Sequence, residues 1–264
     1  MTSKFSISLI MPALNEEKSI ITSIDNTLAS FDDLCIEGEI IVVNDGSKDN
    51  TSKLVAQKMK EDNRIRMITH KMPQGIGSSF WDGFDDVRFN IVTMLPGDNE
   101  NDPWETLRYI DLLEHVDIIN PYAYNKNVRS LLRNTMSSLY LSIINMTFMT
   151  SFRYTNGPVI YRKSILKELG HRSYGFFYQT DILIRSTKKG YLHIDVPYRL
   201  GVREAGKTKL LSLSTFLKGT KDYFNLVGDL YFRRNKKIGK GRSCPDSATA
   251  KRYAPNTKYK GIHG

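Results

Sequence analysis

Residues 39–51, with the sequence EIIVVNDGSKDNT, decide the fold. The run that follows Glu39 and ends at Val43 is apolar and β-branched, which predicts a buried strand. Asn44-Asp45-Gly46-Ser47 comes next, a cluster of residues that favour turns. Three apolar residues then recur at helical spacing: Leu54, Val55 and Met59. A strand, a polar turn and a helix in this order are the repeating unit of a parallel α/β sheet.

The same order of elements repeats on both sides of this stretch. Strands are expected in three further apolar runs: Phe5–Met11, Ile65–Ile68 and Ile91–Leu95. Pro12 is expected to end the first run, and Asn15 to cap the helix after it, because two acidic residues follow Asn15. Two later helices are expected to begin at turn or capping residues, Gly75 and Asp102-Pro103. We therefore predict an α/β fold with a mostly parallel sheet and helices on both faces.

Polar side chains follow three of these strands. Asn15 and Glu16 come after the first strand, Asp45 after the second, and Asp98 after the strand that ends at Leu95. Ligands of parallel α/β sheets bind at the carboxyl ends of the strands. The sequence therefore predicts a binding site at this edge of the sheet.

Composition excludes several classes of protein. The chain has 264 residues, of which 40% are hydrophobic and 25% charged, and this balance is that of a globular domain. The two cysteines, Cys35 and Cys244, are too few for a disulfide framework or a zinc cluster, and we expect a reducing compartment. No signal-peptide pattern opens the sequence. The most apolar long window, Leu139–Met149, is shorter than the ~20 residues that a membrane-spanning helix needs, so no span is expected.

The net charge of +10 is concentrated at the carboxyl end. Residues 233–264 contain ten lysines and arginines and one acidic residue, a net charge of +9 in a segment poor in apolar residues. We expect this tail to be disordered and to bind an anionic membrane surface, and we expect no specific nucleic acid. The rest forms one domain, residues 1–232, with a nucleotide-binding half of about 1–122 and an acceptor half of about 123–232.

Seven segments occur in the order typical of one family: SLIMPALNEE, EIIVVNDGSKDNT, QGIGSSFWDGF, MLPGDNENDP, YTNGPVIYRKSIL, DILIRSTKKGY and VREAGKTKL. In these segments, from about Ser6 to Leu210, the chain resembles the inverting family-2 glycosyltransferases. The resemblance is closest to the branch that contains dolichyl-phosphate mannose synthase and bacterial polyprenyl-phosphate glycosyltransferases. It implies the GT-A fold, a Rossmann-like, mostly parallel sheet in a single domain.

The resemblance implies a set of residues that bind the nucleotide sugar. Base and ribose would contact Pro12, Asn15, Glu16 and Asp45, with Gly46 allowing close approach of the backbone. A glycine-rich turn near the diphosphate would contain two further residues, Gly75 and Gly77. The alternatives are a plain helix cap at Asn15, a solvated turn residue at Asp45, and a simple helix entry at the two glycines.

The resemblance also implies a divalent cation, Mg²⁺ or Mn²⁺, on the donor diphosphate. The family usually holds it with an Asp-x-Asp motif, but this chain has Pro96-Gly97-Asp98-Asn99-Glu100. Asp98 corresponds either to the second aspartate, with Pro96 in place of the first, or to the first aspartate of Asp98-Asn99-Glu100. Asp98 and Glu100 are candidate metal ligands in both registers, because hard cations prefer oxygen ligands. Asp102 is expected to be a helix cap.

The acceptor half contains three candidate phosphate-binding residues. Arg129, Arg133 and Ser137 are spaced four residues apart and therefore share one face of a predicted helix. In the polyprenyl-phosphate branch, arginines with such a serine bind the acceptor phosphate. The alternative is a solvated basic face. The apolar residues that follow Ser137 suit either a helix at a bilayer interface or ordinary core.

Three residues are implied in catalysis: Asp98, Asp181 and Arg203. Asp181 would be the general base for a hydroxyl acceptor, whereas a lipid phosphate is already an oxyanion and needs none. Arg203, together with Lys207, would stabilise the leaving diphosphate. The alternative for these two cations is a loop of solvated charges.

The resemblance thus implies an inverting, metal-dependent glycosyltransferase. It would transfer a sugar from a UDP- or GDP-sugar to a polyprenyl (dolichyl or undecaprenyl) phosphate, as a peripheral protein at the cytoplasmic face of a membrane. One alternative is transfer to a saccharide hydroxyl in polysaccharide or glycan synthesis. The alternative of another class is a catalytically degenerate scaffold or nucleic-acid-binding protein, suggested by the missing aspartate and the basic tail.

Overall fold

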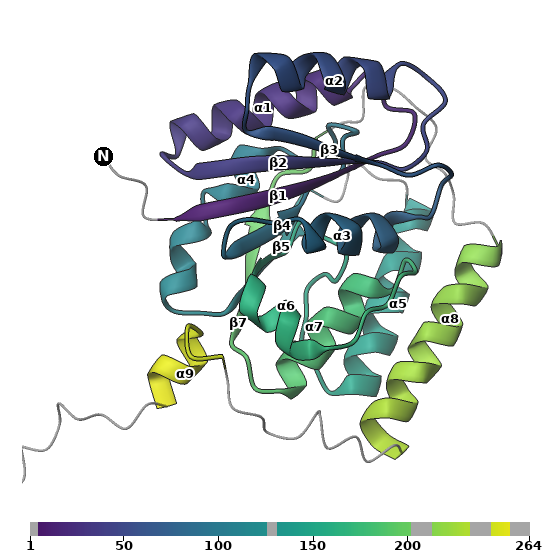
Figure 1. Cartoon of the computed structure of the whole chain (residues 1–264). Coiled ribbons are helices and arrows are strands. Elements are labelled where there is room, and N and C mark those ends of the chain that lie inside the picture. Colours follow the sequence, from purple (N-terminus) through teal and green to yellow (C-terminus); the bar gives the residue numbers. More distant parts are fainter. Residues whose placement is uncertain (1–4, 126–130, 202–212, 233–243, 254–264) are drawn as a thin grey trace, which may run out of the picture.

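The computed structural model describes residues 5–125, 131–201, 213–232 and 244–253. These residues form one α/β domain around a seven-stranded sheet in the order β3-β2-β1-β4-β6-β5-β7 (Figure 1). The strands are β1 (Ser6–Ala13), β2 (Glu37–Asn44), β3 (Ile65–Thr69), β4 (Ile91–Met94), β5 (Ile118–Ala123), β6 (Ile160–Arg162) and β7 (His193–Tyr198). Only β6 is antiparallel to its two neighbours, β4 and β5. The predicted α/β fold with a mostly parallel sheet is confirmed.

Helices cover both faces of the sheet. The helices are α1 (Ile20–Asp33), α2 (Thr51–Glu61), α3 (Ile76–Asp85), α4 (Pro103–Leu107), α5 (Leu131–Phe148), α6 (Lys163–Leu169), α7 (Tyr178–Lys188), α8 (Leu213–Val227) and α9 (Ala248–Tyr253). A 3₁₀ turn, η1 (Ile110–Glu114), and a π turn, η3 (Gly228–Phe232), complete the set. Helices α1, α2 and α4 lie on one face, and α3, α5, α6, α7 and α8 on the other. No helix in the described ranges is long and apolar enough to cross a bilayer.

Strands β1 and β2 are buried on both faces, which explains why their sequences are continuously apolar. Leu9 and Met11 pack against α1 and α2, while Ile10, between them, packs against the aromatic residues of α3. Successive side chains of a strand point to opposite faces, so one apolar run supplies both cores. The two cores therefore hold β1 and β2 from both faces, up to the loops that follow these strands.

Two boundaries predicted at the amino end are wrong. Strand β1 continues through Pro12 to Ala13, and α1 begins at Ile20, not at Asn15. Asn15 has a φ of +56°, which is not a helical conformation, and it lies in a turn that contacts the loop after β2. Asp102 does cap α4, as expected, because its side chain accepts a hydrogen bond from the N–H of Trp104 at 2.9 Å.

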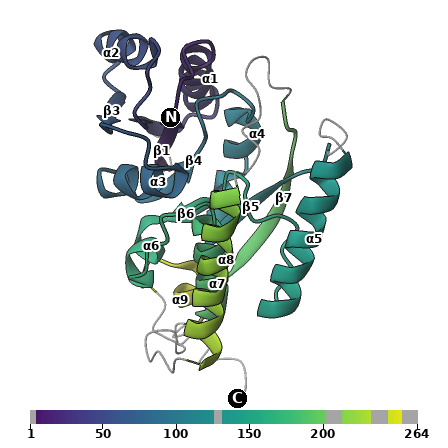
Figure 2. The same ribbon diagram turned by 90° about the vertical axis from the view of Figure 1, so that its right-hand side faces the viewer.

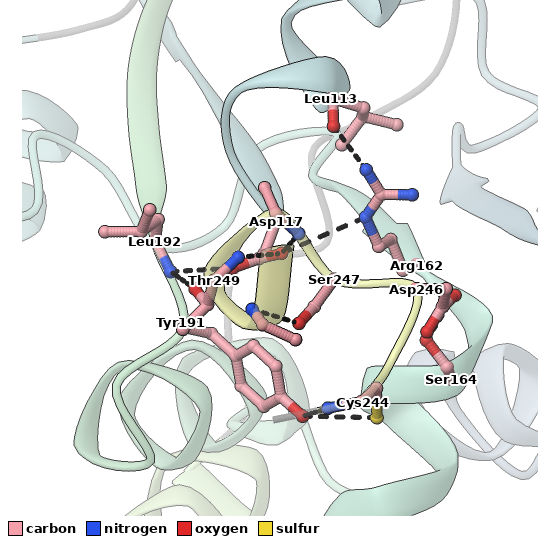
Figure 3. A network of polar contacts seen from close by, with 12 residues as sticks. Leu113, Asp117, Arg162, Ser164, Tyr191, Leu192, Cys244, Asp246, Ser247 and Thr249 are labelled. Atoms are coloured by element: carbon pink, nitrogen blue, oxygen red, sulfur yellow. Dashed lines mark hydrogen bonds and ion pairs between the residues drawn. The ribbon is translucent and has the colours of Figure 1, made fainter. Parts of the chain in front are cut away.

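Part of the basic tail is ordered, so the prediction of disorder is wrong for residues 244–253. Asp117, which is fully buried, accepts hydrogen bonds from the N–H of Ala248 at 2.6 Å and from the hydroxyl of Thr249 (Figure 3). It also accepts one from the N–H of Leu192 at 3.0 Å. Asp117 and Leu192 directly precede β5 and β7, so α9 docks at the end of the sheet opposite the carboxyl edge. The tail residues 233–243 and 254–264 lie outside the described residues.

Candidate functional site

The carboxyl ends of three neighbouring strands meet around Pro12. The N–H of Gly97 donates to the carbonyl oxygen of Pro12 at 2.9 Å, and the N–H of Asp45 donates to that of Ala13 at 2.9 Å. The loop after β4, which carries Asp98, therefore lies on one side of β1, and the loop after β2 lies on the other. The structure thus brings the candidate residues Pro12, Asp45 and Asp98 to one edge of the sheet.

Asn15 and Glu16 connect the turn after β1 to the start of α2. The side-chain oxygen of Asn15 accepts a hydrogen bond from the N–H of Lys48 at 2.8 Å, and its own N–H donates to the hydroxyl of Ser47 at 3.0 Å. The N–H of Glu16 donates to the hydroxyl of Thr51 at 2.9 Å. Asn15 is therefore not a helix cap, and its amide orders the two loops that flank the edge.

Asp45 is buried, and its carboxylate binds the backbone of the loop between β3 and α3. Its carboxylate accepts hydrogen bonds from the N–H groups of Gln74 at 2.7 Å and Gly75 at 2.9 Å. The ring of His70 lies 2.8 Å away through Nδ1. With three partners and almost no exposure, Asp45 is not the solvated turn residue that the sequence left as an alternative.

Three glycines near Asp45 are required for different structural reasons. Gly46 has a φ of +73°, and a β-carbon there would lie 2.8 Å from the carbonyl carbon of Met72. Gly75 has a φ of +98° at the entry to α3. Gly77 is needed for packing, because a β-carbon there would collide with the carbonyl oxygen of Tyr174. Gly46 and Gly75 are therefore the two that shape the edge, and Gly77 joins α3 to the loop before α7.

The loop that carries the candidate metal ligands is hydrogen-bonded to α1 and to the residue that precedes this helix. The carbonyl oxygen of Gly97 accepts hydrogen bonds from the hydroxyls of Ser19 at 2.9 Å and Ser23 at 3.1 Å. One oxygen of the half-buried Asp98 then accepts a hydrogen bond from the N–H of Glu100 at 3.1 Å. The sequence analysis missed both serines, although small polar residues on the buried face of an apolar helix were a visible signal.

Asp98 and Glu100 fit a cation that is shared with a phosphate ligand. In the described part of the chain, no group of three or more acidic, histidine or cysteine side chains is arranged to hold a metal. Mg²⁺ is commonly bound by one or two carboxylates together with substrate phosphates and water. The residues present therefore suit a divalent cation whose remaining ligands come from a diphosphate, and that cation would neutralise charge on the leaving group.

The segment that leads to Arg203 and Lys207 starts beside this loop. The N–H of Gly201 donates to the carbonyl oxygen of Glu100 at 3.0 Å, and Asn101 pairs with Leu200. Arg203 and Lys207 themselves lie outside the described residues. A polar groove of about 350 Å³ runs along this side of the loop, lined by Asn26, Asn99, Asp102, Trp104 and Gly201, among others.

Two of the three candidate acceptor residues, Arg133 and Ser137, lie in α5, the helix that follows β5. Arg133 is exposed and Ser137 is half-buried, while Arg129 lies outside the described residues. Further along α5, Ile144 and Phe148 are fully buried. Five apolar residues of the same helix are exposed: Leu131, Met136, Leu139, Ile143 and Met146. One face of α5 therefore belongs to the core, as one interpretation predicted, and the helix at a bilayer interface stays a prediction.

Asp181, in the first turn of α7, lies in a buried ion-pair network. Its carboxylate accepts hydrogen bonds from Nε of Arg185 at 2.9 and 3.0 Å, and Arg185 also donates to Asp229 at 2.8 Å. Burial raises the pKa of Asp181, while Arg185 and the nearby His171 act in the opposite direction. The described contacts of Asp181 come from α7, η3 and the loop before α7, so it is not brought together with Asp98.

Residues 8–170 match the family described as glycosyl transferase family 2. The chain belongs to this family. It is 30% identical over 172 residues to an undecaprenyl-phosphate 4-deoxy-4-formamido-L-arabinose transferase of Yersinia pestis. This alignment covers 62% of this chain and 51% of the relative. The enzyme of that name from Photorhabdus laumondii is 30% identical over 140 residues, and the alignment covers 52% of this chain and 43% of that relative. The chain thus spans about half the length of these curated relatives.

Solved structures share the fold of this family-2 member. Glucosyl-3-phosphoglycerate synthase of Mycobacterium tuberculosis, in complex with Mn²⁺, UDP-glucose and phosphoglyceric acid, superimposes with a TM-score of 0.61 at 17% identity. The alignment covers 91% of this chain and 82% of the synthase. Another mycobacterial protein gives a TM-score of 0.66 at 19% identity, over 85% and 76% of the two chains. The predicted resemblance to family 2 and the GT-A fold are confirmed.

Proposed function

We propose that this family-2 member transfers a sugar from a nucleoside-diphosphate sugar to a polyprenyl phosphate, with inversion and with Mg²⁺ or Mn²⁺. The observation that carries the proposal is the meeting of three strand ends at Pro12. It places the buried carboxylate of Asp45 on one side of β1 and the loop of Asp98 on the other. A donor lying across β1 would have its base near Asp45 and its diphosphate near Asp98.

Within this proposal, each residue at the edge has a role. Asp45 accepts a hydrogen bond from the base, while Pro12, Asn15, Glu16 and Gly46 form the surrounding wall. Asp98 and Glu100 hold the cation, which lowers the energy of the departing diphosphate. Solved relatives of the fold contain Mn²⁺ or Mg²⁺ together with UDP, and this supports the same arrangement of donor and metal here.

The state of Asp181 favours a phosphate acceptor. A hydroxyl acceptor needs a general base, but the carboxylate of Asp181 is buried against Arg185. A lipid phosphate attacks as an oxyanion, so Arg133 and Ser137 would only have to bind and orient it. The names of the curated relatives, which are undecaprenyl-phosphate transferases, support the same choice. Transfer to a hydroxyl remains the alternative, because the synthase with the same fold was solved with phosphoglyceric acid.

A peripheral position at the cytoplasmic face of a membrane agrees with the exposed apolar surface. The end of α5 contacts α8 through a hydrogen bond of 2.8 Å between the hydroxyls of Thr147 and Tyr223; Figure 2 shows the two helices. Besides the five residues of α5, three aromatic residues of α8 and η3 are exposed: Phe224, Tyr231 and Phe232. Such a surface suits a helix pair at a bilayer interface.

The test is transfer by the purified full chain from a labelled nucleotide sugar. We expect a lipid-linked product with undecaprenyl phosphate and Mn²⁺, and no product after chelation of the metal. Product with a saccharide acceptor alone would support the hydroxyl alternative. If neither acceptor is used and the donor is not hydrolysed, the proposal is wrong and the degenerate scaffold becomes the better explanation.

A further inference from the structure

His70 is a buried histidine that contacts two aspartates at the proposed donor site. It is 8% exposed and directly follows β3, where its N–H donates to the carbonyl oxygen of Asn44 at 2.9 Å. Its Nδ1 lies 2.8 Å from Oδ1 of Asp45, and its Nε2 lies 3.0 Å from a carboxylate oxygen of Asp82 in α3. The second pair of atoms lies within the distance of an ion pair but lacks the alignment of a hydrogen bond.

The partners of Asp45 occupy most of its capacity to accept hydrogen bonds. An ionised carboxylate has about four acceptor positions, two on each oxygen. Because an ionised carboxylate only accepts hydrogen bonds, Nδ1 of His70 is the donor to Oδ1. Oδ1 also accepts from the N–H of Gln74, and Oδ2 accepts from the N–H of Gly75. With respect to the residues that the structure describes, one acceptor position therefore remains, on Oδ2.

A single acceptor position distinguishes the two bases that the donor could carry. Uracil presents one imino N–H between two carbonyl oxygens. Guanine presents its N1–H and its 2-amino group side by side, a pair that matches both oxygens of a carboxylate. With Oδ1 already occupied, one of the two guanine donors would be buried without a partner, and an unsatisfied buried donor is costly.

We propose that His70 sets the base selectivity of the donor site in favour of uracil, by occupying Oδ1 of Asp45. This inference rests on the proposed function, in which Asp45 meets the base of the nucleotide. His70 is a positioning residue, because it acts on the base through Asp45. Gly46 and the loop from His70 to Gly75 keep the carboxylate in this orientation.

The experiment measures the dissociation constants of UDP and GDP for the full chain by calorimetry in the presence of Mn²⁺. The wild-type chain is expected to bind UDP about tenfold or more tightly than GDP, from the cost of one unsatisfied donor. His70→Leu removes the donor to Oδ1 and should reduce the preference to less than about threefold. His70→Asn places an amide N–H near the position of Nδ1 and should keep it.

His115→Leu, at an exposed histidine after η1, is the matched control and should bind both nucleotides as the wild type does. Thermal unfolding of each variant checks that the chain remains folded. Equal affinity of the wild type for UDP and GDP, or an unchanged preference in a folded His70→Leu chain, overturns the inference but leaves the proposed function intact. Failure of every variant to bind either nucleotide overturns both.

Discussion

Gly97 donates its N–H to the carbonyl oxygen of Pro12 at 2.9 Å, so the loop after β4 is attached to the end of β1. A side chain at Gly97 would meet the end of Ile20 at 2.7 Å, so α1 also packs closely against this loop. Asp98, the next residue, therefore starts from a fixed backbone position. As a candidate metal ligand held by the fold in this way, Asp98 would need no rearrangement before the donor binds.

Asp98→Asn should abolish transfer without unfolding the chain. Asp98 is half-buried on the edge of the sheet and contributes no apolar contact to the core, so the loss should affect the cation and not packing. We expect activity to fall by orders of magnitude, because the divalent cation that would neutralise the leaving diphosphate is no longer held. The measurement is the turnover number over a range of Mn²⁺ concentrations.

Asp111→Asn, at an exposed aspartate in η1, is the matched control and should keep full activity. Near-normal turnover of Asp98→Asn in excess Mn²⁺ would show that Asp98 is not a ligand. Thermal unfolding should give similar midpoints for both variants and the wild type.

Arg133→Ala and Asp181→Asn should separate the two acceptor types. For a lipid phosphate, Arg133→Ala should raise the KM for the acceptor sharply. Asp181→Asn should act mainly on stability, lowering it by about 1–3 kcal/mol through the lost hydrogen bonds to Arg185. For a hydroxyl acceptor, Asp181→Asn should instead lower kcat by ~10²–10⁴, the usual effect of losing a general base. Steady-state kinetics with both acceptors and urea unfolding distinguish these outcomes.

The strand ends could be predicted from the sequence because an apolar run and its polar terminus are local features. Asp45 and Asp98 were located in this way. Asn15 was misassigned because an asparagine before two acidic residues has the same local pattern in a helix cap and in this turn. Its conformation is set by contacts with Ser47 and Lys48, which the sheet brings close.

Two other features could not be predicted, for a related reason. His70 has no metal-ligand spacing, and its partners Asp45 and Asp82 become neighbours only when β2, β3 and α3 pack together. The composition of the tail indicated too few apolar residues for a core. It could not indicate that the buried carboxylate of Asp117 would accept the free N–H groups at the start of α9.

Met146→Glu should weaken binding to lipid vesicles. Met146 is 80% exposed on α5, and a charge there opposes insertion of the apolar surface into the bilayer interface. Met59→Glu is the matched control, because Met59 is exposed on α2, which covers the other face of the sheet. Co-sedimentation with vesicles of anionic lipid should show less bound protein for Met146→Glu than for Met59→Glu. Equal binding of the two variants would contradict a membrane-facing α5.

Asp85→Asn should reduce stability at neutral pH and have less effect in acid. Arg172 donates to both carboxylate oxygens of Asp85 at 2.6 Å, and this pairing holds the pKa of Asp85 below its usual value. Because the folded-state pKa is the lower one, the stabilisation is present above pH ~4 and is lost as the pH falls further. The carboxylate is half exposed, so we expect a loss of at most about 1 kcal/mol at pH 7.

Urea unfolding at pH 7, 5 and 3 measures this difference between wild type and Asp85→Asn. The difference between the two proteins should be smaller at pH 3 than at pH 7, because the stabilisation is lost as the pH falls toward the lowered pKa of Asp85. A difference of the same size at pH 7 and pH 3 would show that packing of Arg172 on Trp81, and not the ion pair, is the origin of the stabilisation.

Thr249→Val should destabilise the chain through the docking of α9. The hydroxyl of Thr249 donates to the fully buried Asp117, and hydrogen bonds to charged groups contribute about 1.5–3 kcal/mol. We expect a loss of about that size in the free energy of unfolding, with vesicle binding unchanged. Thr147→Val is a control with the same substitution, because the hydroxyl of Thr147 bonds to an uncharged partner, Tyr223. This control should reduce the free energy of unfolding by less than Thr249→Val does.

Truncation after Phe232 should then have two separable effects. It removes α9, so it should destabilise the chain at least as much as Thr249→Val does. It also removes ten lysines and arginines, each of which contributes about 1 kcal/mol near an anionic leaflet. Binding to anionic vesicles should therefore fall, most clearly at low salt, because a Debye length of ~10 Å at 0.1 M salt limits the attraction. Unchanged stability would show that α9 does not dock, and unchanged vesicle binding at low salt would show that the basic tail does not attach the chain to the membrane.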